Sequence, residues 1–456
     1  MPNSFLKTAA LLALLTPPAL AQTTVQRDPA IADLVAQLSA DSLRAHINGL
    51  TRFGTRHTLS TTTDPKKGIG AARQWILGRF QAYARQAEGR LTATLDTWTL
   101  PADGKRVDKP ADMGNVMATL KGTDPTDTRI FLVQGHMDSR NTNIMNREAD
   151  APGANDDGSG TAAVLELCRV MSKARFPATI IFVALTGEEQ GLLGADHLSQ
   201  RALDEKWNLE AVLNNDIMGS NNSSETRIID NTRLRVFSEG LPLFQTADRA
   251  GTIRQFGSEN DGKARTLARY VKETGERYVD NLEIVTVYRN DRYLRGGDHT
   301  PFVQRGFAAV RLTEMNENYD HQHQDVRTET VEGKPVAYGD LAEFMDFDYL
   351  RKNTAVNLAT LANLAKAPAP PRQVTLEVRN LTNGTALYWQ APATGTVKGY
   401  YVLMRETHMP YWQKKFFTPK LGITLPYSKD NYFFAVQAVS EAGNESLPIL
   451  PAPNLR

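Results

Sequence analysis

Three short apolar segments in the first half of the chain each end in residues that can bind a metal ion. These segments are 130–133 (Ile-Phe-Leu-Val), 180–185 (Ile-Ile-Phe-Val-Ala-Leu) and 211–213 (Ala-Val-Leu). They are continuous rather than alternating, which is typical of strands in a parallel sheet that is buried on both faces. The pattern therefore predicts an α/β fold with a mixed, mostly parallel sheet.

The segments around these strands show helical or alternating spacing. Helical apolar spacing runs through 28–50, 68–85, 161–173 and 338–366, so we expect helices to flank the sheet. Residues 91–100 alternate like an edge strand, and 115–120 form another strand-like segment. A Gly-Thr-Asp-Pro turn at 122–125 predicts that 115–120 forms a hairpin with 129–133.

The composition of the chain changes after residue 366. Residues 367–371 read Ala-Pro-Ala-Pro-Pro, which is typical of a stiff linker. Residues 372–456 are strand-like with short turns, and their length suits one all-β sandwich. The stretches 389–392, 399–403 and 432–439 resemble a fibronectin type III domain. We therefore expect a catalytic domain at 22–366, a linker at 367–371 and a β-sandwich at 372–456.

Residues 1–21 have the features of a signal peptide. A polar start with Lys7 precedes the apolar run 8–15 and an Ala-Leu-Ala ending at Ala21. The apolar run is far shorter than the ~20 residues that cross a bilayer. We expect cleavage after Ala21, a secreted or periplasmic protein, and no membrane insertion.

Charge and cysteine content narrow the possible partners. The 456 residues carry 52 basic and 51 acidic side chains, a net charge of +1, so nothing favours binding to nucleic acid. We expect a small neutral or peptide substrate, with the C-terminal domain as a possible attachment to a surface or polymer. Cys168 is the only cysteine, which excludes an intrachain disulfide.

The polar residues after the strands have the chemistry of a metal site. The carboxyl ends of parallel strands meet at one edge of a sheet, where ligands bind. Zinc binds imidazole nitrogen and carboxylate oxygen, and two zinc ions at ~3.5–4 Å need one shared carboxylate. The available ligands are His136, Asp156, Glu189, Asp216 and His321. From the residues alone His323 is as good a ligand as His321, and Glu188 is left as a general base.

These motifs resemble the co-catalytic dizinc exopeptidase family, which includes secreted bacterial leucyl aminopeptidases and glutamate carboxypeptidases. The resemblance covers about residues 31–366, and the motifs that carry it are His136-Met137-Asp138, 153–160, Gly187-Glu188-Glu189, Asn215-Asp216 and the segment around His321.

The resemblance implies a role for each residue of the site. His136 and Asp216 would hold one zinc ion, Glu189 and His321 the other, and Asp156 would bridge them, with a cis peptide to Asp157. Asp138 would orient His136, and Glu188 would be the general base. In the family an acidic residue follows the last histidine ligand by four positions. Asp325 stands four after His321 and two after His323, which favours His321.

The favoured function is a secreted zinc aminopeptidase that removes N-terminal residues from peptides. A carboxypeptidase would need an arginine for the substrate carboxylate, for which Arg292 and Arg295 are candidates. A glutaminyl cyclase would use a related site with one zinc ion. The alternative that is not an enzyme is a surface-binding protein with an inactive catalytic domain.

Overall fold

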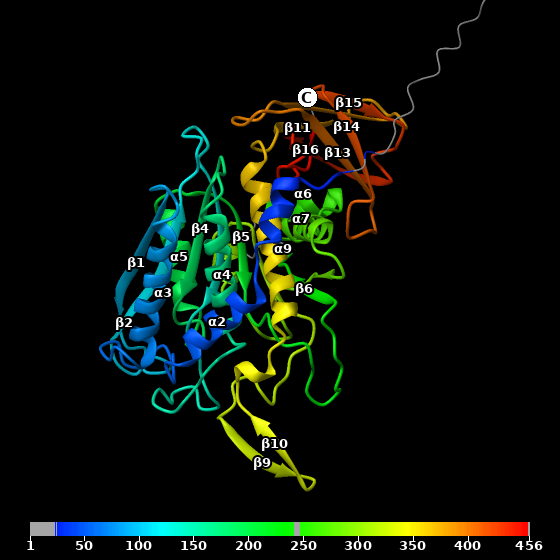
Figure 1. Cartoon of the computed structure of the whole chain (residues 1–456). Coiled ribbons are helices and arrows are strands. Elements are labelled where there is room, and N and C mark those ends of the chain that lie inside the picture. Colours follow the sequence, from blue (N-terminus) through cyan, green and yellow to red (C-terminus); the bar gives the residue numbers. More distant parts are fainter. Residues whose placement is uncertain (1–22, 24, 241–246, 455–456) are drawn as a thin grey trace, which may run out of the picture.

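The structure is a computed structural model that describes residues 23, 25–240 and 247–454. The expected signal peptide, residues 1–21, lies outside the described residues. An eight-stranded sheet forms the centre of the molecule, in the order β1-β2-β4-β3-β5-β8-β6-β7 (Figure 1). Its strands are β1 Leu91–Leu100, β2 Ala111–Leu120, β3 Arg129–His136, β4 Thr179–Leu185, β5 Asn208–Asn215, β6 Arg233–Phe237, β7 Glu283–Val287 and β8 Ala309–Glu314.

The middle of the sheet is parallel. Strands β4, β3, β5 and β8 run in the same direction, whereas β2 pairs antiparallel with β4, and β6 pairs antiparallel with β8. The predicted hairpin between 115–120 and 129–133 is wrong, because β2 pairs with β1 and β4. Strand β3 takes the centre because both of its faces are apolar: Phe131 and Val133 belong to one core and Leu132 to the other.

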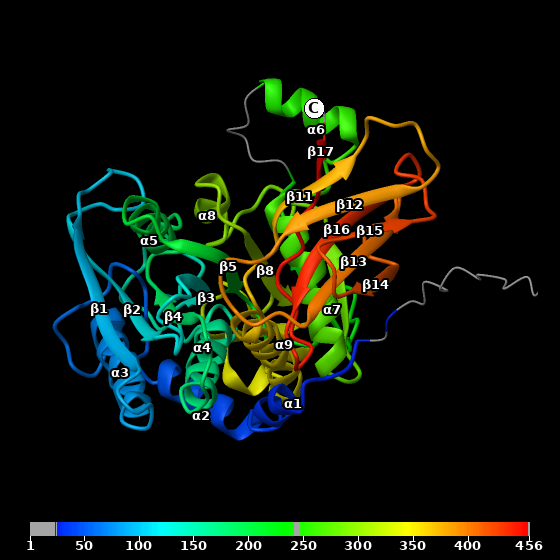
Figure 2. The same cartoon turned by 90° about the horizontal axis from the view of Figure 1, so that it is seen from above.

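Helices cover both faces of the sheet, as predicted (Figure 2). Helices α3, α4, α7 and α9 contact one face, with α1 and α2 packed outside them, and α5 and α8 cover the other. The helices are α1 Pro29–Val35, α2 Ala40–Thr51, α3 Gly68–Ala84, α4 Gly158–Met171, α5 Leu193–Asp204, α6 Ala247–Phe256, α7 Lys263–Tyr278, α8 Thr300–Gln304 and α9 Phe347–Lys366, with a 3₁₀ turn at Ala342–Phe344. None of the described helices is long and apolar enough to cross a membrane.

The last helix, α9, begins later than the sequence predicted. Its N-cap is Asp346, which accepts a hydrogen bond from the backbone N–H of Tyr349 at 2.9 Å. Residues 339–346, which were predicted to be helical, contain only the 3₁₀ turn Ala342–Phe344. They follow a hairpin of β9 Arg327–Val331 and β10 Lys334–Tyr338. Figure 1 shows that this hairpin projects from the body of the molecule.

The residues after α9 form two sheets around a separate core, as the prediction of a β-sandwich required. The core contains Trp389, Tyr400, Phe416 and Val436. One sheet has the order β15-β12-β11-β17 and the other β14-β13-β16. Their strands are β11 Arg372–Glu377, β12 Thr385–Gln390, β13 Gly399–Glu406, β14 Lys414–Thr418, β15 Gly422–Leu425, β16 Tyr432–Val439 and β17 Ala452–Asn454. The likeness to fibronectin type III stays a prediction.

Buried polar contacts fix this C-terminal unit to the α/β body. The Glu445 side chain, 1 % exposed, pairs with the Arg277 guanidinium at 2.7 Å and accepts from Asn363 Nδ2 at 2.8 Å. Burial pushes the pKa of Glu445 upward, but Arg277 and Lys415 outweigh it and hold the pKa at about 2. The C-terminal unit is therefore joined to α7 and α9 by charge as well as by the chain.

We expect Glu445→Ala to lower the free energy of unfolding by about 3–5 kcal/mol, because Arg277 would stay buried without its partner. Urea denaturation measures this loss. The wild-type contribution is complete above the ordinary pKa of 4.5 and disappears as the pH falls toward about 2. As the pH falls between these values, the variant should therefore lose less stability than the wild type, because it lacks the Glu445 carboxylate. The exposed Glu441→Ala is the matched control and should change the free energy by at most ~0.5 kcal/mol; equal effects of both changes would contradict the prediction.

Candidate metal centre

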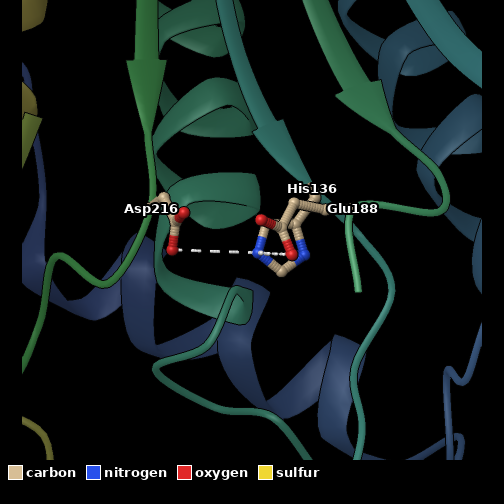
Figure 3. Close-up of side chains that lie close together, drawn as sticks. All are labelled: His136, Glu188 and Asp216. Carbon is tan, nitrogen blue, oxygen red and sulfur yellow. Dashed lines mark ion pairs between the residues drawn. The ribbon is translucent and has the colours of Figure 1, made fainter. Parts of the chain in front are cut away.

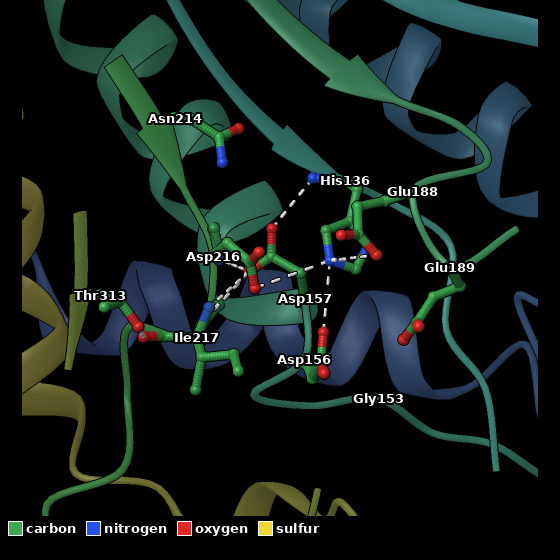
Figure 4. A network of polar contacts seen from close by, with 12 residues as sticks. His136, Gly153, Asp156, Asp157, Glu188, Glu189, Asn214, Asp216, Ile217 and Thr313 are labelled. Carbon is green, nitrogen blue, oxygen red and sulfur yellow. Dashed lines mark hydrogen bonds and ion pairs between the residues drawn. The ribbon is translucent and has the colours of Figure 1, made fainter. Parts of the chain in front are cut away.

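Acidic and imidazole side chains meet where the parallel strands end. His136 is the last residue of β3, Glu188 and Glu189 follow β4, and Asp216 follows β5. Figure 4 shows these side chains converging beyond the strand ends, with Asp156 in the loop before α4. The convergence predicted for the carboxyl edge of the sheet is therefore present.

The first group surrounds the His136 imidazole (Figure 3). From His136 Nε2 the nearest carboxylate oxygens are 3.2 Å away on Asp156, 3.8 Å on Asp216 and 4.0 Å on Glu188. Ligand atoms of His136, Glu188 and Asp216 all lie within 4.8 Å of one another. These distances allow the side chains to close on one ion.

The second group surrounds the His323 imidazole. Its Nε2 lies 2.8 Å from Asp156 Oδ2 and 2.9 Å from Glu189 Oε1. Asp156 thus presents Oδ1 to His136 and Oδ2 to His323. This two-sided placement is what a carboxylate shared between two ions requires.

The position of His321 corrects the choice made from sequence spacing. The structure places His323, not His321, beside Asp156 and Glu189. The His321 ring instead stacks on Phe344, with ring centroids 3.8 Å apart. The spacing failed because residues 319–323 form turns and His323 has a φ of +56°, so the backbone turns the two imidazoles in different directions.

Three buried polar atoms of the site have no hydrogen-bond partner among the described residues. No described residue forms a hydrogen bond to Nε2 of His136, Nε2 of His323 or Oε1 of Glu189, although carboxylates and imidazoles face one another. Burial lowers the pKa of His323, but Glu189 and Asp156 outweigh it and raise the pKa to about 10. A cation between these side chains would satisfy the same carboxylates, and the nitrogen and oxygen donors are those that zinc binds. The residues therefore fit zinc.

Asp138 holds the loop that carries the two glutamates. Its carboxylate accepts backbone N–H groups from Gly187 at 2.9 Å, Glu188 at 3.3 Å and Glu189 at 3.2 Å. It also lies 3.6 Å from His136 Nδ1, which is 3.1 Å from the Asp138 backbone carbonyl. Asp138 therefore sits where it can orient His136, and it positions Glu188 and Glu189 as well.

Asp157 joins β3 to the start of α4. It follows a cis peptide bond from Asp156, as the resemblance implied. Its carboxylate accepts the backbone N–H groups of His136 at 2.9 Å and Gly160 at 2.7 Å. A Cβ on Gly135 would lie 2.6 Å from the Gly160 carbonyl carbon, so only glycine permits this close packing of strand and helix.

Glu188 and Asp298 are buried carboxyl groups whose pKa values are raised. Burial, and then the charges of Glu189, Asp216 and Asp298, raise the pKa of Glu188 well above its ordinary value, although His136 opposes the shift. Burial raises the pKa of Asp298 to about 8, and no described residue forms a hydrogen bond to its carboxylate. The Asp298 carboxyl can therefore carry a proton near neutral pH. A bound dication would oppose both shifts.

Two supporting residues were missed by the sequence analysis. Arg311 lies 3.2 Å from Asp216 Oδ2. Burial pushes the pKa of Asp216 upward, but Arg311 and His136 together outweigh it and hold the pKa at about 2. Asp340 accepts the backbone N–H groups of Asn155 and Asp156 at 2.8 and 2.7 Å. A charged residue within an apolar strand was a usable signal for Arg311. Asp340 carried none, because it lies 184 positions from its partner.

Comparisons with known proteins identify the family and the fold of this chain. The model of peptidase family M28 matches residues 115–343. A probable zinc metalloprotease of Leptosphaeria maculans is 42 % identical over 92 % of this chain and 96 % of its own length. Two solved structures share the fold at 16 % identity. LapA aminopeptidase of Legionella pneumophila has a TM-score of 0.52 and covers 76 % of this chain and 78 % of its own. A glutaminyl cyclase of Bacteroides thetaiotaomicron has a TM-score of 0.50 and covers 72 % and 98 %.

Proposed function

Because the chain belongs to peptidase family M28, we propose that it is a zinc aminopeptidase that hydrolyses the first peptide bond of peptide substrates. The placement of Asp156 between two imidazoles supports a pair of zinc ions. His136 and Asp216 would hold one ion, Glu189 and His323 the other, and Asp156 both. When bound, zinc supplies a water of lowered pKa and polarises a carbonyl oxygen.

The protein's own residues would move the proton. Glu188 lies 4.0 Å from His136 Nε2, at the edge of the ligand groups, and 14 % of its side chain is exposed. It would take a proton from the attacking water and give it to the leaving amine. Burial and the neighbouring carboxylates raise its pKa, which makes the Glu188 carboxylate a stronger proton acceptor, as a general base requires.

The arginine placement favours an aminopeptidase over a carboxypeptidase. A carboxypeptidase needs a free cation for the substrate carboxylate, but Arg292 is held by Glu317 at 2.8 Å. Arg295 lies on the exposed surface. The carboxylates around the proposed zinc pair would instead attract the ammonium group of a free N-terminus.

The place of action is also part of this proposal. Residues 1–21 would direct export, because they combine Lys7, an apolar run and an Ala-Leu-Ala ending. The C-terminal unit would attach the enzyme to a surface or polymer, since none of the proposed metal-binding residues lies in it.

A substrate panel tests this function. The purified chain would be assayed with aminoacyl reporters, with N-blocked peptides that have a free C-terminus, and with peptides that begin with glutamine. We expect hydrolysis of the aminoacyl reporters, its loss with a chelator, and its return with zinc. Cleavage confined to blocked peptides would indicate a carboxypeptidase, and ammonia release from N-terminal glutamine a cyclase. Zinc binding without turnover on any substrate would indicate a binding protein.

A further inference from the structure

The hairpin β9–β10 connects directly to the metal centre at both ends. His323 precedes β9 and Asp340 follows β10, and both contact Asp156. The base of the hairpin is tied down by a hydrogen bond from Gly339 N–H to the Asp320 carbonyl at 3.3 Å. Figure 1 shows the hairpin projecting from the end of the molecule toward which β4 and β5 run. It therefore starts at the rim of the site and extends away from it.

One edge of this hairpin is open for hydrogen bonding, since no described strand pairs with the outer side of β9. The turn has two residues, Glu332 and Gly333, both with positive φ. In such a hairpin the flanking pair Val331–Lys334 exchanges hydrogen bonds, and bonded and non-bonded pairs then alternate. The N–H groups of Thr328 and Thr330 therefore point outward from β9, and both residues are exposed.

The opposite edge is blocked. Pro335 occupies the outward position of β10 that pairs with Thr330, and proline has no N–H to donate. Proline is a common means of preventing another strand from adding to an edge. A two-stranded sheet is marginally stable in water on its own, and a third strand stabilises it. The hairpin thus offers one edge, β9, to a single added strand.

We propose that β9 binds the extended part of a peptide substrate by strand addition, so that the enzyme favours peptides over aminoacyl reporters. This inference rests on the proposed aminopeptidase function. We assign this edge to the substrate because it continues from the metal centre: β9 begins four residues after His323. Thr328 is five residues from His323, a reach of at most ~17 Å at ~3.4 Å per residue. A peptide bound with its N-terminus at the metal centre would reach Thr328 with about its fifth or sixth residue. Dipeptides are too short to reach it.

Octapeptides carrying single N-methyl groups test the pairing without altering the enzyme. Methylation removes one backbone N–H, and in a paired strand only alternate N–H groups face the partner. We expect kcat/KM to fall about five- to tenfold for methylation at alternate positions beyond the fifth and to stay unchanged between them. A response without this alternation, or no response, would overturn the proposal.

Two proline variants provide the matched pair on the enzyme side. Thr330→Pro removes an outward N–H from the open edge, and Ala337→Pro does the same on the blocked edge. We expect only Thr330→Pro to reduce kcat/KM for octapeptides about five- to tenfold, while both variants hydrolyse a leucyl reporter like the wild type. Equal effects of the two variants on octapeptides would overturn the inference.

Binding measurements separate this inference from the proposed function. Octapeptides whose first peptide bond is reduced to CH₂–NH cannot be hydrolysed, and calorimetric titration measures their affinity for both proline variants and the wild type. If no substrate is hydrolysed, the function fails, and alternation in these affinities still decides the pairing. Sedimentation equilibrium tests whether a second copy of the chain pairs with this edge instead. A wild-type dimer that Thr330→Pro dissociates would assign the edge to that second copy and overturn the proposal.

Discussion

Glu188→Gln should keep its zinc and lose nearly all turnover. The amide has the shape of the carboxyl group but cannot accept a proton from water at neutral pH. Loss of a general base typically lowers turnover by roughly 10²–10⁴-fold. We expect metal retention because the proposed ligands of this ion, His136, Asp156 and Asp216, are left unchanged. Metal analysis and steady-state kinetics on the same preparation measure both quantities.

The neighbouring glutamate is the matched control for this prediction. Glu189→Gln changes the residue 2.9 Å from His323 Nε2, so it should release metal as well as activity. Loss of zinc from Glu188→Gln instead would mean that Glu188 is a ligand in the group with His136 and Asp216. Near-normal turnover with full zinc content would remove Glu188 from the role of general base.

The centre of the fold was predictable because its strands are apolar on both faces. A strand such as β3 can only be buried between neighbours, so its continuous apolar run identifies it without knowledge of its partners. The same rule predicted that His136, Glu188, Glu189 and Asp216 would meet, since parallel strands end at one edge.

Pairing of strands was harder to predict than their existence. The turn at 122–125 suggested a local hairpin, but β2 pairs with β4, which lies about 60 residues later in the chain. Strand β3 instead pairs with β4 and β5 and is buried on both faces. A sequence pattern does not show whether this burial or the local turn decides the pairing. The closing helix was also predicted to begin too early, because residues 338–346 contain the end of β10 and the 3₁₀ turn Ala342–Phe344 before α9 starts at its N-cap Asp346.

Supporting residues of the site depend on contacts that leave little trace in the sequence. Asp340 and Arg311 act on Asp156 and Asp216 from distant positions in the chain. The attachment of the C-terminal unit is another example, because Glu445 meets Arg277 across 168 positions. A proline-rich linker suggested an independent domain, but the buried charge pair shows that the two units share an interface.

Between the two histidines, we expect only His323→Ala to remove a metal ion. His323 Nε2 lies within 2.9 Å of carboxylate oxygens of both Asp156 and Glu189, so its loss takes a ligand from the second group. The variant should bind about one zinc ion per chain in place of two. Mutation of a residue that only supports a ligand typically lowers metal affinity or activity by about 10–100-fold. Loss of the ligand itself should therefore lower turnover by more than about 100-fold.

His321→Ala is the matched control because it removes the same side chain two positions away. That imidazole stacks on Phe344 and belongs to neither ligand group, so the change should cost about 0.5–1.5 kcal/mol of stability and leave both ions bound. Zinc per chain after dialysis, measured together with the unfolding midpoint, separates the two effects. Loss of one ion from His321→Ala with full zinc in His323→Ala would return the ligand role to His321, the residue that the spacing to Asp325 had favoured.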